Sequence, residues 1–167
     1  MKNSIVRLLA ITLAMLFVFQ TSFVAFAEDE PDWQDATWTQ EEFDSIYYQN
    51  PNNQVATLAS GLIINYGIAI SNNGSNLLIA GKTICNLNVV KCGFKVVTIK
   101  RRTSSSAAWS TYKEYEDLYN NASSYTLAKT IAVPKGYQYR VYCTYYAKKS
   151  LFSTEKITDS SNIIAID

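Results

Sequence analysis

Tyr137-Gln138-Tyr139-Arg140-Val141-Tyr142-Cys143-Thr144-Tyr145-Tyr146 is the stretch of sequence that decides the fold. Its odd-numbered residues are aromatic or apolar, and the residues between them are mostly polar or amphipathic. Such alternation places successive side chains on opposite faces of a strand, one buried and one partly solvated. Pro134-Lys135-Gly136, just before it, has the composition of a turn. We therefore predict a β-strand over residues 137–148.

Outward from this stretch, the chain contains six more short apolar or alternating runs, with no sustained 3.6-residue period. They span 62–71, 77–85, 94–102, 109–116, 124–133 and 157–166. Asn72-Asn73-Gly74 joins the first two, and Asn-Gly in this position indicates a hairpin because both residues tolerate positive φ. The pattern predicts an all-β domain at 58–167, an immunoglobulin-like β-sandwich of about seven strands. In that fold the strands 94–102 and 137–148 are neighbours, and Tyr137 or Tyr139 forms a tyrosine corner.

Several core and turn motifs of this domain also occur together in a known family. They are Gly61 to Asn65, Asn73-Gly74 followed by Leu77 to Thr83, Val96 to Arg101, Trp109, and Lys135 to Val141. In order and spacing the chain resembles a family of small exported Gram-positive bacterial β-sandwich proteins of unassigned function. The resemblance implies a secreted sandwich and supplies no catalytic residues, and the family pattern does not require the cysteines.

Residues 1–27 have the pattern of a secretory signal peptide. Two basic residues precede an apolar run from Leu8 to Phe19, and Ala25-Phe26-Ala27 places small residues at the −3 and −1 positions of a cleavage site. An uncleaved anchor is the alternative, because the run with its following residues approaches the length that spans a bilayer. We expect cleavage, secretion to the medium or cell surface, and no membrane association afterwards.

The segment 28–57 is an acidic leader. It contains eight Asp or Glu and no Lys or Arg, whereas residues 61–167 carry 13 basic and six acidic side chains, a charge of +7. High charge density favours a flexible, solvated linker. Two other interpretations stay open: the leader docks on its own basic domain through Trp33 and Trp38, or it binds an outside protein.

Part of the leader has the signals of a short helix. Thr39 is a suitable N-cap, and Glu41 and Glu42 fall in the first turn, where acidic side chains interact favourably with the helix dipole. We predict a helix over residues 39–48.

The chain contains no His and three Cys, which excludes several chemistries. Ser-His-Asp and Cys-His catalysis and two-His zinc motifs need imidazole, and a four-Cys zinc site needs one more thiol. We expect no metal and no cofactor. For Cys85, Cys92 and Cys143 four arrangements stay open: a Cys85–Cys143 bridge like the B–F bridge of immunoglobulin-like domains, a Cys85–Cys92 bridge, three buried thiols, or intermolecular pairing.

Candidate ligand-binding residues lie on the predicted outer face of the sandwich. Tyr142 and Tyr146, with Trp109 and Tyr112 from the strand at 109–116 and with Arg140, form a candidate platform on which sugar rings stack. Cross-strand pairing that only stabilises the sheet is the alternative. Further basic residues are candidates for a surface that binds anionic wall polymer, with ordinary solubility charges as the alternative: Lys91, Lys95, Lys100, Arg101, Arg102, Lys148 and Lys149.

Three functions follow from these patterns. We expect a secreted, non-enzymatic binding module for a cell-surface glycan or wall polymer, with no nucleic-acid partner because the protein is exported. A structural or protein-partner role through the acidic leader is the second hypothesis. A small hydrolase that uses a pair of carboxylates is the third, and it requires two acids facing each other across a cleft.

Overall fold

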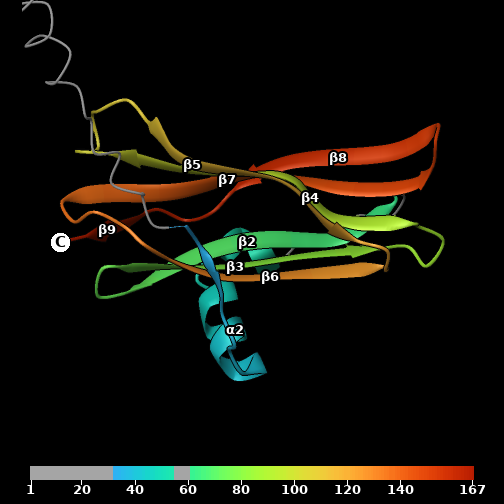
Figure 1. Cartoon of the computed structure of the whole chain (residues 1–167), viewed down its shortest axis with the longest axis horizontal. Coiled ribbons are helices and arrows are strands. Elements are labelled where there is room, and N and C mark those ends of the chain that lie inside the picture. The colour runs from blue at the N-terminus through green and yellow to red at the C-terminus, as the bar shows by residue number, and fades with distance from the viewer. Residues whose placement is uncertain (1–31, 55–60) are drawn as a thin grey trace, which may run out of the picture. The chain divides into compact units, whose positions relative to one another are not determined.

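A computed structural model describes residues 32–54 and 61–167, which form two packed antiparallel sheets (Figure 1). Sheet A has the strand order β1-β6-β3-β2, and sheet B has the order β5-β4-β7-β8, with β9 also paired to β7. The elements are β1 Gln34–Asp35, α2 Gln40–Tyr47, η1 Pro51–Gln54, β2 Ile63–Asn73, β3 Asn76–Cys85, β4 Lys91–Arg102, β5 Ser110–Asn120, β6 Ser124–Ala132, β7 Tyr137–Ser150, β8 Ser153–Ser160 and β9 Ile164–Ile166. The predicted signal peptide at 1–27, the start of the leader and the boundary at 58 lie outside the described residues. No helix within the described ranges combines the length and apolarity of a membrane span.

The predicted all-β fold is confirmed, and β7 shows its cause. Tyr139, Val141, Cys143, Tyr145 and Ala147 point into the core, while the residues between them are only partly buried. β4 pairs antiparallel with β7, as predicted for these two strands. The core fills the space between the sheets, and its largest fully buried side chains include Tyr139, Tyr145, Phe94, Ile63, Ile68, Leu77, Ile99 and Leu127.

The hairpin between β2 and β3 lies one residue later than the Asn-Gly pattern indicated. Asn73 pairs with Asn76, so the loop residues are Gly74 and Ser75. Gly74 has φ 64°, and of the two loop residues it alone has positive φ. A glycine at the first loop position suits a type II′ turn, which leaves Asn73 in the strand.

The prediction of one continuous strand over 157–166 is wrong. β8 begins at Ser153, and the chain leaves the ladder at Ser161 and resumes as β9. The Ser161 hydroxyl accepts the Val141 N–H at 2.9 Å. Asn162 accepts the Ile70 N–H at 2.9 Å and donates to the Ile70 carbonyl at 2.8 Å, so its amide joins the end of sheet B to β2 of sheet A. The Ser161 N–H also donates to the Val141 carbonyl at 2.8 Å. The side-chain bonds of Ser161 and Asn162 leave no alternation signal, so the sequence pattern did not reveal the break.

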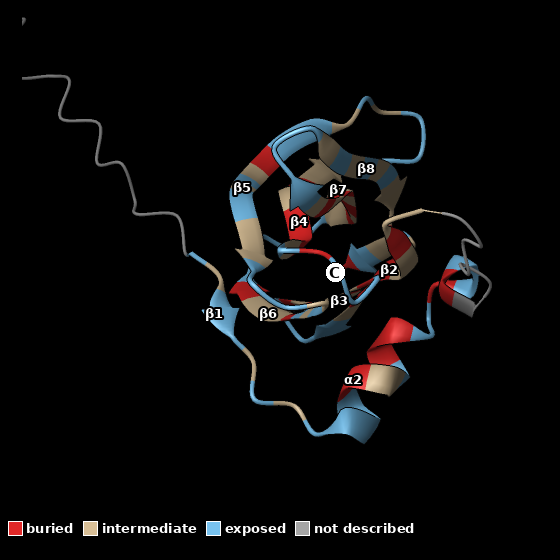
Figure 2. Ribbon diagram, turned by 90° about the vertical axis from the view of Figure 1, so that its right-hand side faces the viewer, coloured by how far each residue is buried: buried red, intermediate tan, exposed pale blue. Residues whose placement is uncertain are grey.

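The described part of the leader wraps around sheet A. β1 pairs with β6 and forms an edge of sheet A, α2 packs on the side of sheet A away from sheet B, and η1 lies against β2 (Figure 1). Figure 2 shows the buried residues of α2 in red; they are Phe43, Ile46 and Tyr47. The predicted helix is confirmed, with Thr39 as N-cap and with the Glu42 carboxylate accepting the Thr39 N–H at 2.8 Å. We call residues 32–54 the strap.

Candidate functional site

The outer face of sheet B gathers cations over aromatic rings. The register places Lys100 opposite Arg140 and Thr98 opposite Tyr142, so β4 and β7 present these side chains in neighbouring rows. The Lys100 ammonium lies 4.9 Å from the centre of the Tyr142 ring, and the Arg140 guanidinium lies 5.3 Å from it. Arg140 also donates from Nε to the Ser161 carbonyl at 3.0 Å, which fixes its direction. The centre of the face is therefore a tyrosine held between two cations.

Each end of this face repeats the arrangement. At the end toward the β4–β5 connection, Arg102 lies 4.4 Å from the Trp109 ring and donates to Gln138 at 2.9 Å. At the other end Lys91 lies 4.5 Å from the ring of Tyr119, which packs on Tyr146 with ring centres 5.3 Å apart. We call these three groups the cation–aromatic face. It contains four of the five candidate binding residues, all except Tyr112.

Tyr112 does not lie on this face, which corrects its inclusion in the sequence-based platform. The side chain is only 8% exposed, because its position in β5 directs it into the core beside Tyr139. Arg101 alternates with Lys100 and Arg102, so it lies on the opposite side of β4, over the rings of Tyr112 and Tyr137 at 4.7 and 4.9 Å. The sequence-based platform placed Trp109 and Tyr112 on one face, although side chains three positions apart on a regular strand point to opposite faces. Trp109 lies before β5, which begins at Ser110.

Four acids of the domain each have a hydrogen-bond or ion-pair partner. Glu114 accepts from the Thr98 hydroxyl at 2.8 Å, and Asp117 pairs with Lys95. The Glu155 carboxylate accepts the Leu62 and Ile63 N–H groups, and Asp159 accepts the N–H of Ser160 at 2.7 Å. Asp117 has φ 58°, a left-handed conformation that is costly for a residue other than Gly. A pocket of about 140 Å³ beside Tyr142 is lined by Thr98, Thr144, Thr158 and Asp159, among others.

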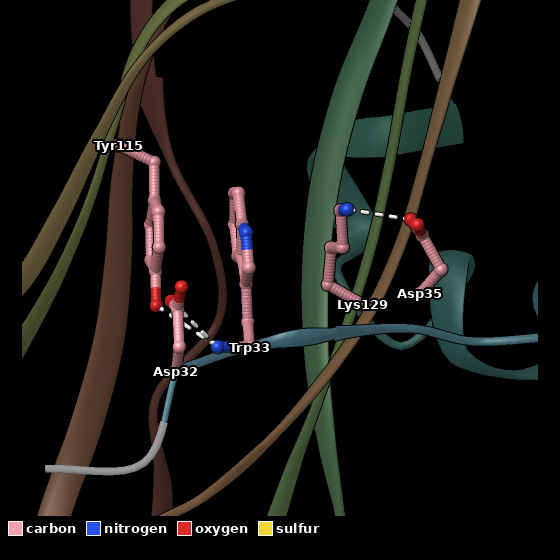
Figure 3. Close-up of polar contacts among 5 residues, drawn as sticks. All are labelled: Asp32, Trp33, Asp35, Tyr115 and Lys129. Carbon is pink, nitrogen blue, oxygen red and sulfur yellow. Dashed lines mark hydrogen bonds and ion pairs between the residues drawn. The ribbon is translucent and has the colours of Figure 1, made fainter. Parts of the chain in front are cut away.

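A second cluster holds the start of the strap between β5 of sheet B and β6 of sheet A (Figure 3). The Trp33 ring stacks on Tyr115 of β5 with centres 3.5 Å apart and planes 4° from parallel, and Lys129 of β6 lies 5.0 Å from the same ring. Lys129 also pairs with Asp35 at 2.5 Å. Trp33 therefore joins β5, an edge strand of sheet B, to β6 of sheet A.

Hydrogen bonds of this cluster shift two pKa values. The Tyr115 hydroxyl bonds to the Asp32 carboxylate, which lowers the pKa of Asp32 below its ordinary value. Burial, and next the same hydrogen bond, raise the pKa of Tyr115. Three interpretations of the leader were open. These contacts match the one in which the leader docks on its own domain. Residues 32–54 differ from the flexible linker that charge density favoured, because their aromatic side chains have apolar surface to cover.

The three cysteines are free and buried, and two of them are neighbours. The Cys85 and Cys92 thiols hydrogen-bond to each other, and this bond together with burial raises the pKa of Cys85 while the same bond lowers that of Cys92. Burial raises the pKa of Cys143 to about 12. Cys92 is paired with Ala147, so Cys143 lies four residues further along β7, roughly 13 Å at strand spacing. That separation exceeds the reach of a disulfide between Cys92 and Cys143, whereas Cys85 and Cys92 are neighbours.

Within the described ranges, no three His, Cys, Asp or Glu side chains gather as metal ligands. Comparison of the chain with known family models, with curated proteins and with solved structures finds no match. The site therefore rests on the geometry above. Sequence reasoning named Lys91 and Lys100 only as general basic residues and missed Tyr119 and the Trp33–Tyr115 stack. Knowledge of the strand register would have placed both lysines on the outer face of sheet B.

Proposed function

We propose that this protein is a secreted, non-enzymatic binding module whose cation–aromatic face binds an anionic polymer of the cell surface. The observation that carries the proposal is the row of three cation–aromatic groups along one face of sheet B. They are centred on Trp109, Tyr142 and Tyr119. The aromatic rings hold the cations at fixed positions, which reduces the side-chain entropy lost when an anion binds.

The dimensions of the face suit an extended ligand. From Gln138 to Tyr146 it follows β7 over nine residues, roughly 26 Å at the rise of a strand. Repeated phosphate, sulfate or carboxylate groups along a polymer match a row of separated cations better than one small ligand does. The partly exposed rings of Tyr142 and Tyr146 supply apolar surface for sugar C–H groups beside the charges.

The compartment and the finer fold assignment belong to the same proposal. The signal-like pattern at 1–27 and the resemblance to exported bacterial proteins support secretion. The strand order supports an immunoglobulin-like fold. In sheet A the strands that correspond to A, B and E are β2, β3 and β6. In sheet B the strands that correspond to C′, C, F and G are β5, β4, β7 and β8. The Tyr139 hydroxyl donates to the Pro134 carbonyl at 2.6 Å, as a tyrosine corner does.

Two observations support this function over the other hypotheses. Trp33 packs on Tyr115, and Phe43 packs with Ile46 against sheet A, so these aromatic side chains of the strap are engaged with its own domain. Four of the domain's acids are engaged by separate hydrogen-bond or ion-pair partners, which supports binding without catalysis.

Binding to dextran sulfate, with neutral dextran of the same chain length as the comparison, tests the proposal. We expect the protein to bind only the sulfated polymer, with an affinity that falls steeply as salt rises, because bound cations release counterions. The variant K100Q/R140Q is expected to lose about tenfold or more in affinity.

The matched control is K82Q/K135Q, which removes the same charge outside the face. Equal losses in the two double variants would mean that net charge alone binds the polymer and would overturn the proposal. So would equal binding of the parent protein to neutral dextran.

A further inference from the structure

One end of the sandwich exposes large apolar side chains. Phe152 is 99% exposed and Leu151 80% exposed, both in the turn between β7 and β8. Leu87 is 90% and Val90 51% exposed, both in the β3–β4 connection at 86–90. Only two other large hydrophobic residues in the described ranges are comparably exposed. We call Leu87, Val90, Leu151 and Phe152 the apolar tip.

The two connections of the apolar tip lie side by side. The Val90 N–H donates to the Lys148 carbonyl at 2.7 Å, and Lys91 pairs with Lys148 in the ladder of β4 and β7. Figure 1 places the β7–β8 turn at the same end of the sandwich as the start of β4. Two connections that are separated by about 60 residues in sequence therefore carry their exposed apolar side chains at the same end of the sandwich.

Lysines surround the apolar tip. Lys91, Lys148 and Lys149 adjoin it, and Lys156 lies opposite Tyr146 on β8. The acid of this region, Glu155, accepts the backbone N–H groups of β2 and its preceding residue, so its carboxylate is directed toward sheet A. The tip thus has apolar side chains at its outermost points and positive charge behind them.

We propose that the apolar tip inserts into the interfacial layer of an anionic lipid bilayer, with the lysines on the headgroup phosphates. An almost fully exposed Phe on a projecting two-residue turn has no groove around it, and a fluid lipid layer accommodates such a shape without a matching cavity. Tip-to-tip pairing of two copies would bring the lysines of both against each other. Anionic lipid instead complements them, since each basic residue close to such a surface is attracted to it. The proposal goes beyond polymer binding and departs from the expectation of no membrane contact after signal cleavage.

Cosedimentation with vesicles tests the proposal, using phosphatidylcholine alone and phosphatidylcholine with phosphatidylglycerol. We expect binding to the anionic vesicles only, and we expect L151S/F152S to weaken it about a hundredfold, because two apolar side chains no longer leave water. The control I163S changes a 44% exposed apolar residue outside the tip and should bind as the parent does. Thermal unfolding and dextran sulfate binding of L151S/F152S should equal those of the parent.

Three results would overturn the proposal: binding of L151S/F152S to anionic vesicles with the parent affinity, equal binding of the parent to neutral vesicles, or a parent dimer that L151S/F152S dissociates. If the parent binds anionic vesicles but not dextran sulfate, the tip proposal stands and the proposed polymer-binding function fails. The reverse result retains polymer binding and removes the tip proposal.

Discussion

Replacing Trp33 by Ala removes the contact that joins the strap to both sheets. The Trp33 ring stacks on Tyr115 at 3.5 Å and receives Lys129 on its other side at 5.0 Å. Such an aromatic pair contributes about 0.5–1.5 kcal/mol, and a cation at the surface of a ring about 0.5–1 kcal/mol. Adding the lost burial of a partly buried indole, we expect the free energy of unfolding to fall by about 2–3 kcal/mol.

Urea unfolding of the parent, W33A, Y115A and the double variant measures this contribution. These four proteins form a double-mutant cycle, which should give a coupling energy of about 1 kcal/mol between the Trp33 and Tyr115 rings. Q34A, the next residue of the strap, is exposed and should change stability by less than about 0.5 kcal/mol. Equal stability of W33A and the parent, or a coupling energy near zero, would show that the strap does not hold the edges of the two sheets.

Three further predictions follow from the strap and the thiols. A Cβ added at Gly67 would overlap the Tyr47 hydroxyl, so G67A should destabilise the protein by about 2–3 kcal/mol in urea unfolding; no loss would mean that the strap does not approach β2 this closely. Burial raises the pKa of Tyr47 from 10.0 to about 12, so above pH 10 the unfolded state loses this proton first, and stability should fall up to about pH 12. Y47F should flatten that fall by about 1.4 kcal/mol per pH unit, and an unchanged slope would refute the assignment. Oxidised glutathione should join Cys85 to Cys92 and stabilise the protein by about 2–3 kcal/mol, whereas a bridge containing Cys143 in peptide mapping would contradict the geometry.

The strands were predictable because their signals are local. The alternation over 137–146 assigned the inner face of β7 correctly, since each side chain's direction depends only on its position in the strand. The helix cap at Thr39 was equally local, because its partner Glu42 lies three residues away. The hairpin after β2 was predicted at the right place but one residue early, because Gly74 alone has positive φ and Asn73 stays in the ladder.

Contacts between distant segments were not predictable in detail. Trp33 was a candidate for docking, but its partner Tyr115 is 82 residues away, and nothing in the sequence around either residue names the other. The break after β8 depends on Asn162 bonding to Ile70, 92 residues earlier. Tyr112 was assigned to the outer face together with Trp109, although side chains three positions apart on a regular strand point to opposite faces.

Mapping of backbone amide shifts by NMR as dextran sulfate is added tests the central claim most directly. If the cation–aromatic face binds the anionic polymer, the largest changes will follow β4 and β7 around Lys100, Arg140 and Tyr142, and raised salt will reverse them. Changes concentrated in the strap around α2, or at the apolar tip with β4 and β7 unmoved, would contradict the account.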